Sequence, residues 1–368
     1  MNHMNKKKEI VELPVYWHSS VEQVNEDISK VKKGKVHTLL PSAGGRPIYM
    51  VEYGENTLPK SMASLSSACG AQDYRCYANK TEDGYIPTVF LAGCMHGGEF
   101  EGTVALMNLI SLLENGVDLA GNRNDDILAL VEKLHIIMIP MCNPDGRSHI
   151  PFDNFVGHTF HDLRYYGQGT WKNGELCGWP GCKTIHPIKD YCEYLGGYFN
   201  DDGVNMMHDD YFVDPSNEVR NVLKTARDYS PDFTILFHGG GNTLNTYFHV
   251  SYINTDARRQ IYEVGKLAEK AMAKENLIFT VNDDFVKSGG EDVGLPPFML
   301  TSAVFNVCGE PCVTFESNQG LTECEDPYCL TNDEIYRSHF IYLEVLFKWV
   351  LENKTAEKHR EKLKNLTY

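Results

Sequence analysis

Short, mainly apolar runs alternate with amphipathic segments along this chain. Four of the runs are bounded by turn-forming residues, which is typical of strands covered on both faces of a parallel sheet. They comprise residues 86–92, 134–141, 233–237 and 312–315. Two further segments, 36–40 and 48–53, are predicted to form a hairpin around Gly44 and Gly45, and residues 246–252 are predicted to form another strand.

Helical periodicity appears between these runs. Val104, Met107 and Ile110 recur at the spacing of one helical face. Ser19-Ser20-Val21-Glu22 has the form of a capping box, and Asp214-Pro215 has the form of a helix start. Further helices are expected over residues 125–133, 258–274 and 331–351. The alternation predicts an α/β fold, a single-domain α/β/α sandwich whose mixed, mostly parallel sheet is flanked by helices.

The chain has no internal repeat and no flexible linker, so we expect one domain over residues 15–353. Within it, residues 147–212 show little periodicity but contain many aromatic side chains. An irregular span of this length is usually functional. Two interpretations are open, a pocket wall and a surface subdomain that packs on itself. Residues 354–368 form a charged tail to which the sequence assigns no role.

The bulk composition, with 42% hydrophobic and 23% charged residues, is that of an ordinary globular protein. The formal net charge of −16 argues against nucleic acid or an anionic membrane as a partner, because phosphate binding needs a basic surface. No apolar run is long enough to span a bilayer. The basic residues 1–8 are followed by Glu9 and not by the apolar core of a signal peptide, so we expect a cytoplasmic protein.

Polar residues follow each central strand. His96 and Glu99 follow the first, Asn143-Pro144-Asp145-Gly146 the second, His238 the third and Glu316 the fourth. Parallel strands present their carboxyl ends at one edge of the sheet, where open α/β sheets bind ligands, so we expect these residues to meet. His96 and Glu99 could converge on one cation. Taken alone, the pair would fit a loop histidine beside a solvated glutamate equally well.

In order and type, these motifs resemble the zinc metallocarboxypeptidases (the carboxypeptidase A-like, or M14, family). A lead-in Gly44-Gly45-Arg46-Pro47-Ile48 completes the resemblance, which extends over residues 15–350. It implies that His96, Glu99 and His238 bind one zinc ion per chain, a His₂Glu ligand set of which carboxypeptidase A itself is a known example. It also implies that Glu316 is the general base for a water activated by zinc. A buried carboxylate that needs a partner is the alternative role of Glu316.

Other catalytic motifs are absent from the sequence. There is no Gly-x-Ser-x-Gly, so His238-Gly239-Gly240-Gly241 is not supported as an esterase oxyanion loop. Neither a phosphate-binding loop, nor a dinucleotide fingerprint, nor His-Glu-x-x-His is present.

The substrate-binding motif departs from the family pattern Gly-Val-Asp-Leu-Asn-Arg-Asn-Phe. The corresponding residues are 203–210, in which Met207 and His208 replace the Asn-Arg pair that clamps the terminal carboxylate of the substrate. A neutral histidine cannot reproduce the bidentate grip of a guanidinium, although it could act as a cation at acidic pH. Asn205 replaces an aspartate expected to orient a ligand histidine, which leaves that ligand less basic.

The same resemblance assigns the remaining positions. Arg164 is the expected oxyanion-stabilising residue, and Lys172 is the alternative. Phe298 or Met299 occupies the region of a tyrosine that the family carries upstream of the base. We assign His208, Lys172 and Phe298 to substrate binding.

Three functions fit this sequence. The leading hypothesis is a zinc-dependent carboxypeptidase that acts on peptides. The altered Met207-His208 pair motivates a second, a zinc-dependent deacylase or amidase that acts on N-acyl amino acids or peptidoglycan-type amides. The third is a catalytically weak zinc-containing protein that binds peptides, against which Glu316 argues. The sequence does not predict the oligomeric state.

The eleven cysteines include no Cys-x-x-Cys pair. Cys94, Cys142, Cys308 and Cys312 lie in apolar segments and are predicted to be buried thiols. The spacings of the clusters at 177–192 and 324–329 do not favour a structural zinc site.

Overall fold

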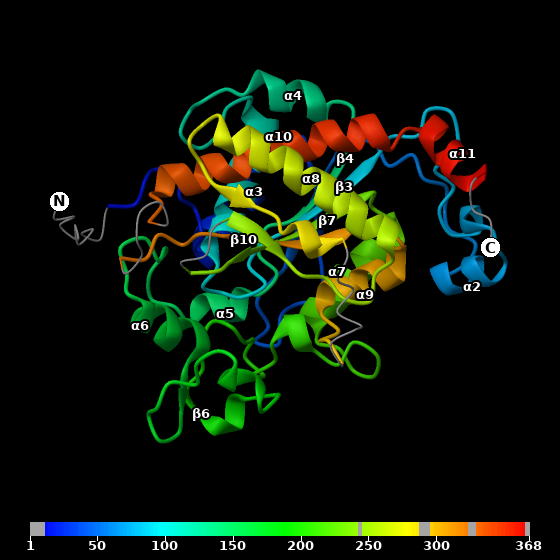
Figure 1. Cartoon of the computed structure of the whole chain (residues 1–368). Coiled ribbons are helices and arrows are strands. Elements are labelled where there is room, and N and C mark those ends of the chain that lie inside the picture. The colour runs from blue at the N-terminus through cyan, green and yellow to red at the C-terminus, as the bar shows by residue number, and fades with distance from the viewer. Residues whose placement is uncertain (1–11, 242–244, 287–294, 323–328, 365–368) are drawn as a thin grey trace.

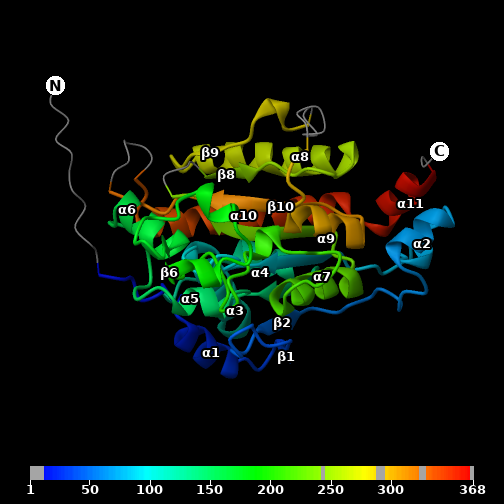
Figure 2. The ribbon, with the colours of Figure 1, turned by 90° about the horizontal axis from the view of Figure 1, so that it is seen from below.

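An eight-stranded sheet forms the centre of the computed structural model, which describes residues 12–241, 245–286, 295–322 and 329–364 (Figure 1). The strand order is β1-β2-β4-β3-β7-β10-β8-β9, and Figure 2 shows the sheet from its β1 edge to its β9 edge. The strands are β1 (Lys35–Thr38), β2 (Tyr49–Tyr53), β3 (Thr88–Ala92), β4 (His135–Ile139), β7 (Phe233–Gly239), β8 (Asn245–Phe248), β9 (Phe279–Thr280) and β10 (Cys312–Ser317). The central strands β4, β3, β7 and β10 run parallel, whereas β1 and β2 pair antiparallel with their neighbours. Strand β8 pairs antiparallel with β10 and parallel with β9. The predicted mixed, mostly parallel sheet is confirmed.

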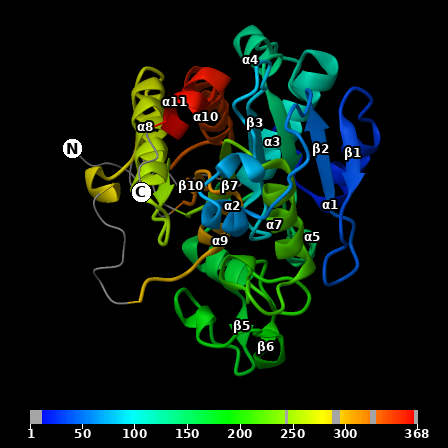
Figure 3. The same cartoon turned by 90° about the vertical axis from the view of Figure 1, so that its right-hand side faces the viewer.

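The central strands are buried on both faces, which explains their nearly continuous apolar sequences. Val89 and Leu91 of β3 belong to one hydrophobic core, whereas Phe90 and Ala92 belong to the core on the opposite face. Helices cover both cores, with α4, α8 and α10 on one side and α7 and α9 on the other (Figures 1 and 3). The first layer comprises α1 (Val21–Ser29), α3 (Phe100–Asn115), α4 (Asp125–Val131), α8 (Thr255–Ala273) and α10 (Asn332–Asn353), and the second comprises α7 (Asn217–Tyr229) and α9 (Leu300–Cys308).

Several local predictions differ from the structure in detail. The capping box of α1 joins Ser20 and Gln23, one residue later than the predicted box that begins at Ser19. The motif predicted to be a turn instead begins a short helix, α5 (Pro144–Ser148), because the side chain of Asn143 accepts a hydrogen bond from the N–H of Gly146 at 2.9 Å. The helix α9 was not predicted from the sequence pattern.

The aromatic segment 147–212 contains only short elements and lies below the sheet in Figures 1 and 3. These are α6 (Phe160–Asp162), η2 (Leu163–Gln168), β5 (Thr170–Trp171), η3 (Gly181–Lys183), η4 (Lys189–Tyr191), β6 (Cys192–Tyr194) and η5 (Met206–His208). A small core of its own includes Cys177, Cys182, Ile188 and Phe199.

The charged segment after residue 353 forms the helix α11 (Ala356–Lys364), which lies at the same end of the molecule as α2 (Leu65–Gly70) in Figures 1 and 2. Lys354 Nζ lies 3.3 Å from Glu310, and His359 Nε2 lies 3.2 Å from Asp232. Lys80 completes this buried network, with Nζ 3.0 Å from Asp232 and 3.2 Å from Glu310. Residues 354–364 are therefore joined to the ends of the sheet strands by buried ion pairs. The predicted domain boundary at residue 353 stays a prediction.

Cys94, Cys142, Cys308 and Cys312 are buried free thiols, as predicted. Cys329 is disulfide bonded, and Cys324 of the same predicted cluster lies outside the described residues. In the described ranges, no helix combines the length and the apolar character needed to cross a membrane.

Candidate metal centre and active site

Two histidines and one glutamate converge at the carboxyl ends of β3 and β7. His96 follows β3, Glu99 is the N-cap residue of α3, and His238 lies in β7. Their ligand atoms all lie within 4.8 Å of one another. Nδ1 of His96 is 2.7 Å from Glu99 Oε1, and Nδ1 of His238 is 2.7 Å from Glu99 Oε2. Residues that follow two neighbouring parallel strands and lie far apart in the sequence thus meet around one buried carboxylate.

The loop that carries His96 packs directly against the backbone of α5. The N–H of Gly97 donates a hydrogen bond to the carbonyl of Gly197 at 2.6 Å. A Cβ atom on Gly97 would lie only 1.9 Å from the carbonyl carbon of Gly146, so position 97 needs glycine. The glycine after His96 and the glycine of the Asn-Pro-Asp-Gly motif are therefore neighbours in the fold.

Asp145 links that motif to the lead-in sequence. This fully buried carboxylate accepts hydrogen bonds from the Ser42 hydroxyl at 2.5 Å, the Gly44 N–H at 2.7 Å and Arg46 Nη1 at 2.8 Å. Charge-assisted hydrogen bonds of this kind are strong. Residues 42–46 and 143–146 thus form a scaffold beside the His96 loop.

Asn205 fixes the protonation of His96. Oδ1 of Asn205 accepts a hydrogen bond from the N–H of Met207 at 2.9 Å and lies 3.1 Å from Nε2 of His96. Because an amide oxygen only accepts, Nε2 of His96 must carry the proton. The unprotonated Nδ1 then points at the Glu99 carboxylate.

This arrangement fits a bound cation. Burial lowers the pKa of His96 despite the opposing charge of Glu99, so the ring stays neutral near pH 7. Although burial acts to raise it, the pKa of Glu99 is lowered to about 2 by His96 and His238, so the carboxylate is charged. A lone pair and a carboxylate oxygen 2.7 Å apart repel each other unless a cation lies between them. Two imidazole nitrogens and a carboxylate form a donor set that suits zinc.

Tyr198 holds the plane of the His96 ring. The two rings are stacked with centroids 3.8 Å apart and planes inclined by 6°. The sequence contained no signal for this contact beyond the abundance of aromatic residues in segment 147–212. That segment therefore forms one wall of the site in addition to its own small core.

Glu316 lies beside this trio. It is the register partner of His238 on the parallel strands β10 and β7, so both side chains leave the same face of the sheet. Burial, together with the charge of Glu99, raises the pKa of Glu316 to about 7, although His238 and Lys183 oppose the shift. A carboxylate with a pKa near neutrality is suited to accept and return a proton.

A family model described as zinc carboxypeptidase (peptidase M14) matches residues 21–290, which is most of the chain. The chain belongs to the zinc carboxypeptidase family. No curated protein sequence matches it.

Solved structures of carboxypeptidases share the fold. A metallo-carboxypeptidase from Burkholderia cenocepacia is 14% identical, with a TM-score of 0.56 over 90% of this chain and 69% of its own. A Pseudomonas aeruginosa metallo-carboxypeptidase in complex with (2-guanidinoethylmercapto)succinic acid is 12% identical, with a TM-score of 0.53 over 90% of this chain and 68% of its own. Carboxypeptidase A from Helicoverpa armigera is 13% identical, with a TM-score of 0.51 over 95% and 76%.

The positive charge of Lys183 lowers the pKa of Glu316, the candidate general base. Lys183 was not among the residues predicted from the sequence. It ends η3 and is half-buried, with Nζ 5.2 Å from the ring centroid of Trp179. Burial lowers the pKa of Lys183, while Cys182 and Glu316 raise it. In turn, its charge lowers the pKa of Glu316 and of His208. No motif or periodicity marks Lys183 in the sequence.

His208 lies close enough to feel the charges of the trio. Burial, followed by the charge of Lys183 and by the imidazoles of His96 and His238, lowers the pKa of His208 to about 3. The ring is therefore neutral near pH 7, and the assignment of His208 to substrate binding stays a prediction.

The other predicted residues make their recorded contacts with residues outside the trio, in the part of the chain that the structure describes. Arg164 packs over the Phe160 ring, with Cζ 4.6 Å from the centroid, and Lys172 is exposed. Phe298 packs against the rings of Tyr211, Phe212 and Tyr252. No hydrogen bond or ion pair joins Arg164 or Lys172 to the trio or to Glu316 within the described ranges. Their assigned roles stay predictions.

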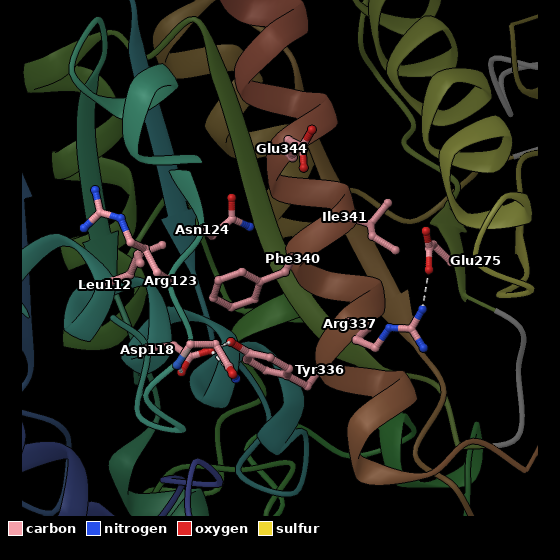
Figure 4. A pocket seen from close by; sticks show the side chains of 11 residues that line it. Leu112, Asp118, Arg123, Asn124, Glu275, Tyr336, Arg337, Phe340, Ile341 and Glu344 are labelled. Atoms are coloured by element: carbon pink, nitrogen blue, oxygen red, sulfur yellow. Dashed lines mark hydrogen bonds and ion pairs between the residues drawn. The ribbon is translucent and has the colours of Figure 1, made fainter. Parts of the chain in front are cut away.

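A separate pocket of about 260 Å³ lies at the far end of α3 (Figure 4). One of its lining residues, Leu112, follows Glu99 along α3, so the pocket lies roughly 20 Å from the trio. Its charged groups neutralise one another, since Arg337 lies 2.6 Å from Glu275, and the hydroxyl of Tyr336 donates to Asp118 at 2.6 Å. It therefore lacks the unpaired polar groups that mark a catalytic site.

Proposed function

We propose that this protein is a zinc-dependent carboxypeptidase that hydrolyses the C-terminal peptide bond of its substrates. One observation carries the proposal. The Nδ1 atoms of His96 and His238 face the same carboxylate, Glu99, while Glu316 stands in register beside His238. The His₂Glu set leaves room for a further ligand, as catalytic zinc sites require.

His96, Glu99 and His238 would hold the metal. When bound, zinc supplies a Lewis acid that polarises a carbonyl group and lowers the pKa of water toward ~7. Glu316 accepts a proton from the attacking water at a carboxylate oxygen and returns it to the leaving amine nitrogen. The pKa of about 7, raised first by burial, suits Glu316 to both steps.

Lys183 supplies the positive charge that the Met207-His208 pair lacks. Its ammonium is near enough to Glu316 to lower the pKa of that carboxyl, whereas His208 is neutral. We assign to Lys183 the stabilisation of negative charge on the substrate, either the oxyanion that develops at the scissile carbonyl or the terminal carboxylate. A point charge of this kind gives less geometric selection than an arginine fork.

The altered clamp also favours a second candidate, a zinc-dependent deacylase or amidase. Met207 is 5% exposed and belongs to the core packed under α7 and α9, so it offers no polar contact to a carboxylate. An enzyme without a bidentate carboxylate clamp could accept N-acyl amino acids or peptidoglycan-type amides.

A peptide-library experiment distinguishes the candidates. Zinc-loaded protein and a zinc-loaded Glu316→Gln variant are incubated with mixed peptides and analysed by mass spectrometry. Stepwise loss of C-terminal residues in the first sample alone supports the carboxypeptidase. If no peptide is shortened although zinc is bound, the proposal fails, and release of free amine from N-acyl amino acids would then identify the deacylase. Peptide binding without either reaction would leave only a peptide-binding protein.

A further inference from the structure

A pocket of about 540 Å³ lies behind the wall formed by residues 204–209. Its size is within the range of pockets that bind small ligands or side chains. Five carboxylates line it, from Asp202, Asp209, Asp210, Asp214 and Glu218. The wall itself connects the pocket to the candidate active site, because Asn205 contacts His96 on the other side.

The basic groups of the pocket neutralise only some of these acids. Arg220 is paired with Asp214 at 2.6 Å. Nε2 of His186 accepts a hydrogen bond from the N–H of Asn205 at 2.8 Å, and burial lowers its pKa, so the ring is neutral. Lys189 does not line the pocket, and its Nζ atom lies 4.0 Å from Oδ1 of Asp202. A negative potential therefore remains inside the pocket.

Glu218 gives a second, independent indication of a ligand. Its side chain is only 1% exposed, and Oε1 accepts hydrogen bonds from the N–H of Ala43 at 2.9 Å and from Asn200 Nδ2 at 3.1 Å. Oε2 has no hydrogen-bond donor among the described residues. Leaving such an atom unpaired costs free energy. A donor that enters the pocket beside Glu218 would satisfy it.

The ligand chemistry that fits is an organic cation. The acids are distributed around the pocket and do not converge, since in the described chain the only three-residue group with metal-ligand spacing is His96, Glu99 and His238. A hard divalent cation needs several converging oxygens. An ammonium or guanidinium group with several N–H donors can instead bind separated carboxylates.

The surroundings of the pocket favour a cation that is part of a peptide. Phe212 and Val213, which lie between the lining residues Asp210 and Asp214, are 78% and 82% exposed. Exposed apolar side chains next to a charged pocket are typical of a surface that binds an extended chain with an apolar and a charged residue.

We propose that this acidic pocket binds a lysine or arginine side chain of the polypeptide on which the metal site acts, at a residue other than the one released. That the ligand belongs to the substrate rests on the proposed function, whereas its positive charge is inferred from the pocket alone. Because Asn205 contacts His96 while Val204 and Asp209 line the pocket, residues 204–209 separate the pocket from the metal ligands, and a cation bound there belongs to a residue more distant from the scissile bond.

A binding experiment tests the pocket without relying on hydrolysis. Calorimetry measures the affinity of zinc-loaded Glu316→Gln protein for tetralysine with an amidated C-terminus and for the same peptide with acetylated side chains. We expect the charged peptide to bind at least about tenfold more tightly, because close charge pairs in a partly desolvated pocket contribute strongly. Binding should also weaken as salt is raised.

Variants of the pocket complete the test. Glu218→Gln and the double variant Asp202→Asn/Asp210→Asn should each weaken the binding of tetralysine amide by about fivefold or more. Glu361→Gln on α11, an exposed acid remote from the pocket, is the matched control and should leave it unchanged. The double variant changes only exposed acids, so it keeps the test valid if Glu218→Gln lowers the melting temperature.

The outcomes separate the two proposals. Charge-dependent binding that the pocket variants weaken, together with no shortening of any peptide, would refute the carboxypeptidase and leave the pocket standing. Equal affinity for charged and acetylated peptides, or affinity unchanged in both pocket variants, overturns the inference even if C-terminal residues are released. Tight binding of calcium that the variants abolish, without an effect on the peptide, would also overturn it.

Discussion

Nε2 of His96 donates a hydrogen bond to Oδ1 of Asn205 across 3.1 Å, at the position where the family pattern has an aspartate. The contact orients a candidate zinc ligand and decides which of its nitrogens is free. Since an amide is a weaker acceptor than a carboxylate, His96 is a less basic ligand here than an aspartate would make it. The candidate metal site thus keeps its geometry, but His96 is a weaker electron-pair donor to the metal.

Replacing Asn205 should change zinc affinity in opposite directions, depending on the substitute. Asn205→Leu removes the acceptor, and we expect zinc to bind about 10–100-fold more weakly. Asn205→Asp restores a charged acceptor at the same position and should bind zinc at least as tightly as the wild type. Titration against a competing chelator measures both affinities. Equal weakening in the two variants would show that Asn205 acts through the fold of η5 and not through His96.

Loss of the Lys183 charge should reduce turnover. We expect Lys183→Met to lower kcat/KM by about 10²-fold, the effect of removing one group that stabilises transition-state charge. Because Lys183 lowers the pKa of Glu316, the acidic limb of the pH–rate profile should move to higher pH in this variant. Lys183→Arg should keep most of the activity.

Lys172→Met tests the alternative assignment of the oxyanion role, since Lys172 belongs to the same aromatic segment but is exposed. If Lys183 holds that role, Lys172→Met should lower kcat/KM much less than Lys183→Met does. A large loss in Lys172→Met with none in Lys183→Met would return the oxyanion role to Lys172, the alternative to Arg164 in the family resemblance.

Lys80 should be essential to stability. It is 1% exposed and pairs with Asp232 at 3.0 Å and with Glu310 at 3.2 Å. Lys80→Met leaves two buried carboxylates short of a counter-charge, and we expect it to lower the free energy of unfolding by about 3–5 kcal/mol. Urea unfolding followed by circular dichroism measures the change. A loss below about 1 kcal/mol would mean that Lys354 and His359 alone balance the network.

The same network predicts that the protein loses stability in acid. Burial acts to raise the pKa of Asp232, but Lys80 and His359 outweigh it and lower the pKa to about 2. The pKa of Glu310 is lowered as well, since Lys354 and Lys80 outweigh the effect of burial. In unfolded chains such groups titrate near ~4. The carboxylates therefore stabilise the fold above about pH 4, and this contribution is lost as the pH falls toward 2.

The free energy of unfolding, measured in the presence of a chelator to exclude effects of metal release, should decrease steadily below about pH 4. Asp232→Asn should be less stable at pH 7 and show a shallower decrease. If the wild type and this variant had parallel pH profiles, the network could not be the source of the acid sensitivity.

The sequence was sufficient to predict the mixed, mostly parallel sheet and to predict which residues meet at its carboxyl edge. The central strands carry apolar residues on both faces, and parallel pairing brings the residues that follow them to one edge. His96, Glu99, His238 and Glu316 could therefore be grouped without knowledge of the structure. The family assignment follows from the same residues and is confirmed by the family model.

Other features depend on contacts that a linear sequence does not reveal. Tyr198 and Lys183 belong to an aperiodic segment, so their positions beside His96 and Glu316 result from tertiary packing alone. The helix α9 was not predicted because its N-cap, Met299, makes no side-chain capping hydrogen bond and the segment therefore carries no capping motif. The short helix α5 begins at a proline motif that also fits a turn.

The decisive measurement is the rate at which zinc-loaded protein shortens one peptide, compared with the rate for its C-terminally amidated form. We expect that only the peptide with a free carboxylate loses its last residue, and that Glu316→Gln lowers this rate by about 10³-fold or more. Equal cleavage of both peptides, or a Glu316→Gln variant that retains the wild-type rate, would contradict the proposed carboxypeptidase function.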